Sequence, residues 1–585
     1  MLQVPTRTAS AVLTILTALA LTTSCATQTE PTLPDHASVD GTAPNTAPVS
    51  AARDLRFEKA QAPRPAAAER HTFAMSQEAF VAPTHPMLAP EFHTEQYDAI
   101  AEPGFVTVAE QPRSTFSVDV DTASYANVRR LLREGRLPPA GAVRIEELLN
   151  YFSYDYPEPS DERPFSVTTE VGPAPWHPEH QLVLIGLQGR HLDLGDVPPR
   201  NLVFLLDVSG SMRPANKLAL VQGALRKLVD DLRPEDHISI VVYAGGSGIV
   251  LAPTSGRNKS TILEALDGLH AGGATDGASG IRLAYDLARK HFNERGINRV
   301  ILATDGDFNV GTTSRSALVE IIEGERASGV FLTVLGVGVG NLKDATMEQL
   351  ADRGNGNYAY LDSPAEARKV LVEEASGTLI TIAQDVKLQL EFNPRRVDAY
   401  RLIGYENRRL ANRDFNDDTK DAGEIGAGHS VTALYEIVPA GADADIGDID
   451  ALRYQAPRDL TDDAASDELL TVKLRYQEPG GSKSTLHEVA LRGDTNAENP
   501  STNFRFAAAV ASFGMALRDS PERGTASFAM AQNLAKNAIG PDPHGYRAEL
   551  IRLTAMARDL TPTAVSAPAP RHQPALHRPE NRPPT

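Results

Sequence analysis

Apolar runs and apolar side chains at helical spacing alternate through the middle of the chain. Residues 201–206 (NLVFLL) are nearly all apolar, as expected of a parallel strand buried on both faces. Residues 215–232 then place apolar side chains three and four positions apart, which indicates an amphipathic helix. The alternation continues and predicts strands at 201–206, 237–243, 298–303, 330–337 and 358–361, an edge strand at 249–251, and helices at 215–232, 261–269, 278–291, 316–326, 345–353 and 364–375.

This order of elements predicts an α/β fold built on a doubly wound parallel sheet. In such sheets, ligands bind beyond the carboxyl ends of the strands. Shorter patterns flank the α/β region: strands at 115–120, 165–171 and 181–187 with helices at 126–133 and 144–152 come before it. Strands at 469–476 and 486–491 and two helical segments come after it. The pattern therefore predicts a small N-terminal α+β module and a C-terminal module of β-strands followed by helices.

The first residues have the pattern of an export signal. Arg7 supplies a positive charge, and 11–21 form an apolar stretch that is too short to span a bilayer. The only cysteine, Cys25, follows in the sequence LTTSC, which resembles the lipobox of bacterial lipoproteins. The resemblance implies a lipidated Cys25 and an anchor in the cell envelope, facing the periplasm or the exterior. Ala26 after the cysteine favours the outer membrane. Ordinary cleavage after Ala26 is the alternative.

These patterns together predict the boundaries of the parts of the chain. Residues rich in Ala, Pro, Thr and Glu after the signal predict a disordered tether, and the Pro-rich end of the chain predicts a disordered tail. The expected parts are a signal and lipobox at 1–25, a tether at 26–100, the N-terminal module at 101–195, the α/β domain at 199–377, the C-terminal module at 378–560 and the tail at 561–585.

Composition narrows the function classes. The chain has 585 residues, with 57 Lys and Arg against 76 Asp and Glu, and a formal net charge of −19. This acidity argues against nucleic acid as a partner, because phosphates need a basic surface. A single cysteine excludes an internal disulfide framework, cysteine-ligated zinc and iron–sulfur clusters within the chain.

Three loops at the expected carboxyl ends of strands carry oxygen ligands. Asp207, Ser209 and Ser211 are spaced by two residues after the first strand, Thr275 lies in the sequence GATDG, and Asp305 follows the strand at 298–303. These are hard oxygen donors without His or Cys, so they suit Mg²⁺ first, with Ca²⁺ or Mn²⁺ as alternatives, and do not suit Zn²⁺. The five side chains leave a coordination position open, which a carboxylate from another protein could take.

With these loops in order, residues 199–377 resemble a von Willebrand factor type A (VWA) domain, and the loops resemble its metal-ion-dependent adhesion site (MIDAS). The resemblance implies a Rossmann-like fold and a divalent cation that binds an acidic side chain of a partner. The alternative is that Ser209 and Ser211 only cap the following helix. The sequences FSVDVDTASYANVRRLL, VRIEELLNYFSYDYP and NRDFNDDTKDAGEIGAGHSVTALYEIVP extend the likeness, because the chain is similar to bacterial YfbK-like VWA lipoproteins from about residue 95 to 560.

Two further acidic motifs need an interpretation. Asp119 and Asp121 follow a short strand like the paired aspartates of haloacid-dehalogenase-type phosphatases, but no doubly wound domain surrounds them. We expect a strand-end turn with exposed acids. Residues 414–421 (DFNDDTKD) alternate acids like an EF-hand loop, yet Thr419 stands where the loop needs glycine. We expect a solvated loop there, with a calcium site as the alternative.

The motifs favour a binding protein over an enzyme. The sequence contains no G-x-S-x-G, no G-x-x-x-x-G-K-[ST] and no H-E-x-x-H. We therefore expect a membrane-anchored, metal-dependent protein-binding module of the adhesion or scaffold type, whose unknown protein partner supplies an Asp or Glu. The alternatives are a structural envelope protein with a purely stabilising metal, and a metal-dependent hydrolase.

Overall fold

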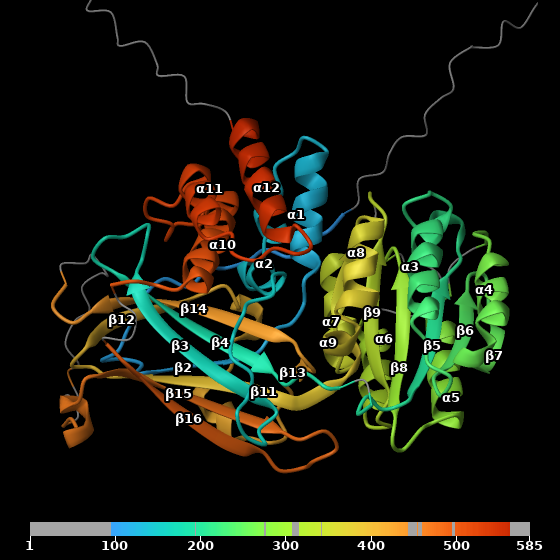
Figure 1. Ribbon diagram of the computed structural model, residues 1–585, viewed down its shortest axis with the longest axis horizontal. Coiled ribbons are helices and arrows are strands. Elements are labelled where there is room, and N and C mark those ends of the chain that lie inside the picture. The colour runs from blue at the N-terminus through green and yellow to red at the C-terminus, as the bar shows by residue number, and fades with distance from the viewer. Residues whose placement is uncertain are drawn as a thin grey trace, which may run out of the picture. The chain divides into compact units, whose positions relative to one another are not determined.

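A computed structural model describes residues 95–561 except 194, 274–275, 307–314, 341, 443–452, 454–458 and 494–497 (Figure 1). The expected signal segment, Cys25, most of the tether and nearly all of the tail lie outside the described residues. Of the helices that are described, none combines the length and apolar character needed to cross a membrane.

The central sheet confirms the predicted α/β class. Its six strands have the order β10-β9-β8-β5-β6-β7. All neighbouring pairs are parallel except β7, which runs antiparallel to β6 at the edge. The edge strand predicted at 249–251 is present within β7, and because it runs antiparallel the sheet is mixed rather than wholly parallel. The strands are β5 (Arg200–Asp207), β6 (His237–Tyr243), β7 (Ser247–Ser255), β8 (Ile297–Thr304), β9 (Phe331–Val337) and β10 (Tyr358–Leu361).

Helices cover both faces of this sheet. Successive side chains of β5 point to opposite faces, so each face has apolar side chains that need covering. Leu202, Phe204 and Leu206 pack into one core with α3, α4 and α8, whereas Val203 and Leu205 pack into the other with α5, α6 and α7. The uninterrupted apolar run of β5 follows from this burial on both faces. The helices are α3 (Leu218–Asp230), α4 (Lys259–Asp267), α5 (Gly277–Lys290), α6 (Arg315–Arg326), α7 (Asp344–Arg353) and α8 (Pro364–Arg368), after which a π-helical turn (Lys369–Glu373) leads to α9 (Ala375–Leu379).

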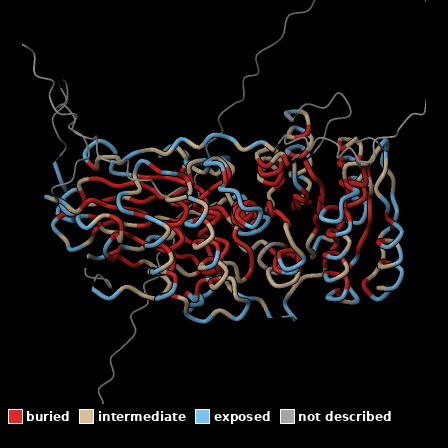
Figure 2. The backbone as a smooth tube through the Cα atoms, turned by 90° about the horizontal axis from the view of Figure 1, so that it is seen from above, coloured by how far each residue is buried: buried red, intermediate tan, exposed pale blue. Residues whose placement is uncertain are grey.

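Strands from before and after the α/β domain form two further sheets with a common core. One sheet has the order β1-β12-β14-β4-β3, and the other has β13-β11-β15-β16 with β2 also paired to β11. In Figure 2 the buried residues lie in the interior of the molecule and the exposed residues lie mostly around its outside. The strands are β1 (Val106–Thr107), β2 (Arg113–Ser117), β3 (Phe165–Pro173), β4 (Gln181–Gly189), β11 (Thr381–Phe392), β12 (Val397–Ile403), β13 (Gly423–Gly426), β14 (Ser430–Pro439), β15 (Glu468–Gln477) and β16 (Thr485–Arg492).

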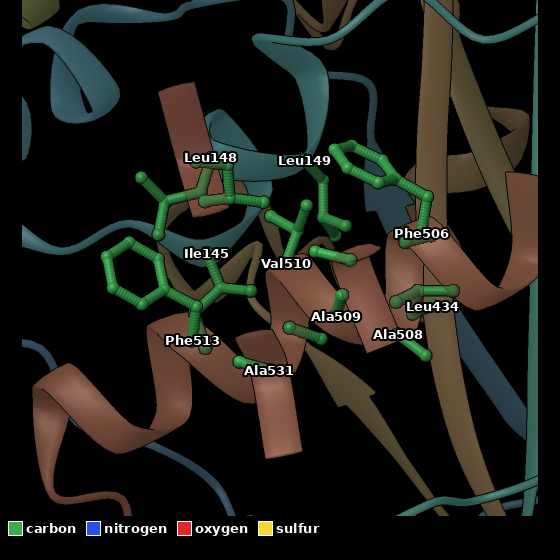
Figure 3. Close-up of a cluster of buried hydrophobic side chains, with 14 of the residues drawn as sticks. Ile145, Leu148, Leu149, Leu434, Phe506, Ala508, Ala509, Val510, Phe513 and Ala531 are labelled. Carbon is green, nitrogen blue, oxygen red and sulfur yellow. The ribbon is translucent and has the colours of Figure 1, made fainter. Parts of the chain in front are cut away.

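The flanking helices also combine across the chain. Phe506, Val510 and Phe513 of α10 share a core with Ile145 and Leu148 of α2 (Figure 3). The two flanking segments, which the sequence treats as separate modules, thus pack together through strand pairing and a helical core. Their boundaries in the sequence stay a prediction. The helices are α1 (Ala123–Arg133), α2 (Ile145–Asn150), α10 (Thr502–Arg518), α11 (Phe528–Asn537) and α12 (Tyr546–Leu560), of which α11 was not predicted.

The acids at the end of β2 are buried, which corrects the expectation of an exposed turn. Asp119 and Asp121 are only 3% and 2% exposed, and Arg408 contacts them at 3.1 and 3.2 Å. The same guanidinium contacts Asp352 of α7 at 2.8 Å. Arg408 therefore joins the segment before the α/β domain, the domain itself and the segment after it in one ionic network, in which Asp119 and Asp121 are buried and Asp352 is partly exposed.

The acidic loop at 414–421 uses its carboxylates for local hydrogen bonds. Asp417 Oδ1 accepts from the backbone N–H of Thr419 at 2.9 Å and from its hydroxyl at 2.6 Å. Asp418 accepts from the Ser484 backbone N–H at 3.2 Å, and Asp421 pairs with Arg326 at 2.6 Å. These contacts favour the loop interpretation over a calcium site.

A buried glutamate beside the Arg408 network makes stability depend on pH. Glu146 of α2 is 1% exposed, and burial, with the charge of Glu406, raises its pKa from 4.5 to about 8. Because the folded-state pKa is the higher one, its contribution to stability is fully present below pH 4.5 and is lost as the pH rises through about 8.

Glu146→Gln keeps this side chain neutral at every pH. We expect the variant to be more stable than the parent by about 1–3 kcal/mol at pH 9 and similar to it near pH 4. Urea unfolding at pH 4, 7 and 9 measures the difference, with the exposed Glu478→Gln as control. Parallel pH curves for the parent and Glu146→Gln would contradict this expectation.

Candidate metal centre

Asp207 ends β5, the strand that lies between β6 and β8 in the central sheet. Its side chain is 0% exposed and is held by neighbouring strand ends. Oδ1 accepts from the Ser209 backbone N–H at 2.8 Å, and Oδ2 accepts from the Tyr243 hydroxyl at 3.3 Å and the Thr304 hydroxyl at 3.2 Å. Tyr243 ends β6 and Thr304 ends β8, so three adjacent parallel strands fix one carboxylate at their carboxyl edge.

Ser209 and Ser211 turn back beside this carboxylate. Their hydroxyl oxygens lie 3.0 Å apart, within hydrogen-bonding distance. Ser209 precedes the 3₁₀ turn Gly210–Met212, and its side chain makes no capping hydrogen bond to that turn. This geometry disfavours the interpretation in which the serines only cap the following helix. It leaves the Ser209 hydroxyl beside Asp207 and the Ser211 hydroxyl beside that of Ser209.

Asp305 follows β8 and is also 0% exposed. Its Oδ2 lies 2.8 Å from Nζ of Lys217, the residue just before α3. Asp305 is close enough to Asp207 to affect its ionisation. Burial raises the pKa of Asp207 to about 6, with the Asp305 charge adding to the rise and the hydrogen bonds from Ser209 opposing it. Two buried carboxylates thus share the site at the edge of the sheet.

The fifth predicted ligand, Thr275, lies outside the described residues. The residues on either side of it are anchored near the site. Gly272 N–H donates to the Val208 carbonyl at 2.7 Å, and Asp276 N–H donates to the Ala244 carbonyl at 2.7 Å. Gly272 and Asp276 therefore lie beside the ends of β5 and β6. The structure brings Asp207, Ser209, Ser211 and Asp305 together, and their metal-ligand role stays a prediction.

Sequence analysis did not identify three residues of this cluster, namely Lys217, Tyr243 and Thr304. Thr304 and Tyr243 end their strands, as Asp207 does, so their positions at this edge could have been inferred. Lys217 had no such signal, because it falls within the helix predicted at 215–232, where a lysine usually extends into solvent.

The donor set fits a hard divalent cation. It comprises two carboxylates and two hydroxyls, all oxygen, at the ends of the neighbouring strands β5 and β8. No group of three or more His, Cys, Asp and Glu residues arranged to hold a metal is present in the part of the chain that the structure describes. The four described donors would therefore need water, Thr275 or a partner group to complete the six oxygens that Mg²⁺ prefers.

Comparisons with known proteins agree with this architecture. The family model described as von Willebrand factor type A domain matches residues 201–373. A model described as von Willebrand factor matches 91–184, and one described as the C-terminal part of uncharacterized protein YfbK matches 377–560. The central sheet with its loop cluster thus corresponds to the VWA match, and the flanking strands and helices correspond to the other two.

Individual relatives show how far the similarity extends. Uncharacterized protein YfbK of Escherichia coli strain K12 is 44% identical over 475 residues, which cover 80% of this chain and 82% of that protein. Inter-alpha-trypsin inhibitor heavy chain H3 of Mesocricetus auratus is 28% identical over 262 residues, 41% of this chain and 29% of that one. The solved structure of a von Willebrand factor type A protein from Catenulispora acidiphila is 17% identical, covers 68% of this chain and 91% of its own, and has a TM-score of 0.40.

The similarity to YfbK covers four fifths of the chain, and the three family models match the flanking segments and the central sheet. The chain therefore belongs to the YfbK family of VWA-domain proteins.

Proposed function

We propose that the chain is a membrane-anchored protein-binding module that holds a divalent cation, Mg²⁺ first, at Asp207, Ser209, Ser211, Thr275 and Asp305. VWA domains commonly mediate metal-dependent protein interactions. The observation that carries the proposal is the convergence of two buried carboxylates and two hydroxyls from the loops after β5 and β8. A bound cation would supply a Lewis-acidic position for an Asp or Glu of the partner protein.

The cluster supports cation binding on electrostatic grounds. Two carboxylates that are 0% exposed repel each other and have lost most of their hydration. Lys217 offsets one of these charges at Asp305, while the described contacts of Asp207 are all to neutral donors. A cation beside Asp207 would complete the neutralisation, and the Ser209 and Ser211 hydroxyls offer it further oxygens.

The hydrolase alternative has less support. VWA-domain proteins are generally non-enzymatic adhesion or scaffold modules. The Asp119 and Asp121 carboxylates, which an aspartate-based phosphatase would need free, are ion-paired to Arg408. Asp121 Oδ1 also accepts from the Tyr358 backbone N–H at 2.7 Å. These contacts give the acid pair a structural role at the junction with β10.

Partner capture tests the proposal. The full-length chain, immobilised and incubated with bacterial envelope extract, should retain a partner in Mg²⁺ and lose it in EDTA. Asp207→Ala should lose it in both conditions, whereas Asp267→Ala, which alters an exposed acid of α4, should behave like the parent. Capture that survives EDTA and Asp207→Ala would refute the adhesive role. Unchanged capture with a lower melting temperature in EDTA would favour the purely stabilising metal.

We also propose that Cys25 is lipidated and anchors the chain in the bacterial envelope, with the outer membrane favoured. The support is the apolar stretch 11–21 followed by the only cysteine of the chain. Cells grown with an alkyne fatty acid should label the parent, while Cys25→Ser should lose the label and leave the membrane fraction. Labelling that persists in Cys25→Ser would contradict the anchor.

A further inference from the structure

Lys217 is buried at the carboxyl ends of the central strands, between Asp305 and Gly338. The residue is 5% exposed, although lysines are rarely buried without a partner. Its Nζ lies 2.8 Å from Asp305 Oδ2. Its alkyl chain crosses Gly338, just after β9, where a Cβ would lie 2.2 Å from Lys217 Cε. Gly338 has a φ of +84°, and its carbonyl accepts from the Tyr360 hydroxyl at 2.6 Å. The backbone after β9 therefore leaves room for this one side chain.

The position of Lys217 changes the charge of the candidate metal centre. Three described side chains of the cluster that carry charge are Asp207, Asp305 and Lys217. When all three are ionised, they carry a net charge of about −1, and this becomes about +1 once a divalent cation is added. Without the lysine the two carboxylates would carry about −2, and the same cation would make the site neutral.

We propose that Lys217 makes the cation-loaded centre more positive by one charge, and so favours an anionic group of the partner while weakening the binding of the cation itself. The proposal rests on the cation site described above and names the electrostatic device behind its preference for a carboxylate. Both effects follow from Coulomb interactions over a few ångströms in a poorly hydrated site, where one charge has a large influence.

The test separates the two effects by using the cation alone and then a simple carboxylate. Mn²⁺ binding to the full-length chain is measured by electron paramagnetic resonance, and acetate is then titrated into the Mn²⁺-saturated protein. Lys217→Met, which keeps the apolar stem and removes the charge, should bind Mn²⁺ about tenfold more tightly and acetate about tenfold more weakly than the parent. Lys217→Gln, which can still donate a hydrogen bond to Asp305, should shift both affinities in the same directions.

Arg200→Met is the matched control. Arg200 is also buried and ion-paired, to Asp236 at 2.7 Å, but it begins β5 and so lies at the opposite edge of the sheet. This variant should leave Mn²⁺ and acetate affinities unchanged even if it lowers the melting temperature. The control thus distinguishes the loss of a nearby charge from the general effect of breaking a buried ion pair.

The outcomes separate this inference from the proposed function. If the parent binds Mn²⁺ and both Lys217 variants bind it no more tightly, the role of Lys217 is overturned and the cation site stands. The role is also overturned if the variants bind acetate as well as the parent does. If neither the parent nor the variants bind Mn²⁺, both the cation site and this inference are overturned.

Discussion

Asp207→Asn should reduce the affinity for Mn²⁺ by roughly 100-fold or more. Mutating a residue that only hydrogen-bonds to a metal ligand typically lowers metal affinity by about 10–100-fold, and Asp207 is expected to be a ligand itself. The substitution removes the charge of a side chain that is 0% exposed and lies at the centre of the cluster. The Asn oxygen can still accept from the Ser209 backbone N–H, so the turn after β5 should persist. Mn²⁺ titration of the full-length variant measures the loss.

The matched control for this result is Asp267→Asn. Asp267 ends α4 in the same domain and is paired with Arg226, with about half of its side chain exposed. Its replacement should leave Mn²⁺ affinity unchanged. Retention of parent-like affinity in Asp207→Asn would mean that Mn²⁺ binds elsewhere, and the assignment of the centre would then be wrong.

Arg408→Leu should destabilise the chain by about 3–5 kcal/mol at neutral pH, the usual effect of removing one partner from a buried ion pair. The substitution would leave Asp119, Asp121 and Asp352 without the cation that contacts each of them at 2.8–3.2 Å. The fluorescence of Trp176, the single tryptophan, reports unfolding in urea because this side chain is 0% exposed.

The loss should depend on pH in a defined direction. Burial raises the pKa of Asp121 well above its ordinary value and also raises that of Asp352, so both bind protons more readily in the folded chain. The destabilisation in Arg408→Leu should therefore be greatest above these pKa values and smaller near pH 4. Arg413→Leu is the control, since the Arg413 side chain is 90% exposed and lies 3.7 Å from Asp414. Equal effects of the two substitutions would contradict the role of the buried network.

Local sequence patterns were sufficient to predict the central domain. The apolar run 201–206 became β5 (Arg200–Asp207), because a strand buried on both faces needs apolar residues at nearly every position. The carboxyl ends of its neighbours were then expected at the same edge, which placed Asp207 and Asp305 together. The spacing of Ser209 and Ser211 after Asp207 also predicted that both hydroxyls would lie in the same turn.

Contacts between distant segments could not be predicted in this way. Phe116 of β2 pairs with Leu388 of β11, and no periodicity within either strand indicates its partner. Asp119 and Asp121 looked like exposed acids because the residue that neutralises them, Arg408, lies far along the chain. The burial of Lys217 could not be predicted for a similar reason, because the space for its side chain is provided by Gly338 at the end of another strand.

Crystals of the full-length chain soaked in Mn²⁺ would test the central claim most directly, through anomalous scattering from the ion. We expect a single strong anomalous peak among Asp207, Ser209, Ser211 and Asp305 at the carboxyl ends of β5 and β8, and no such peak in crystals of Asp207→Asn. Crystals of the parent without a peak at that position, at saturating Mn²⁺, would contradict the account.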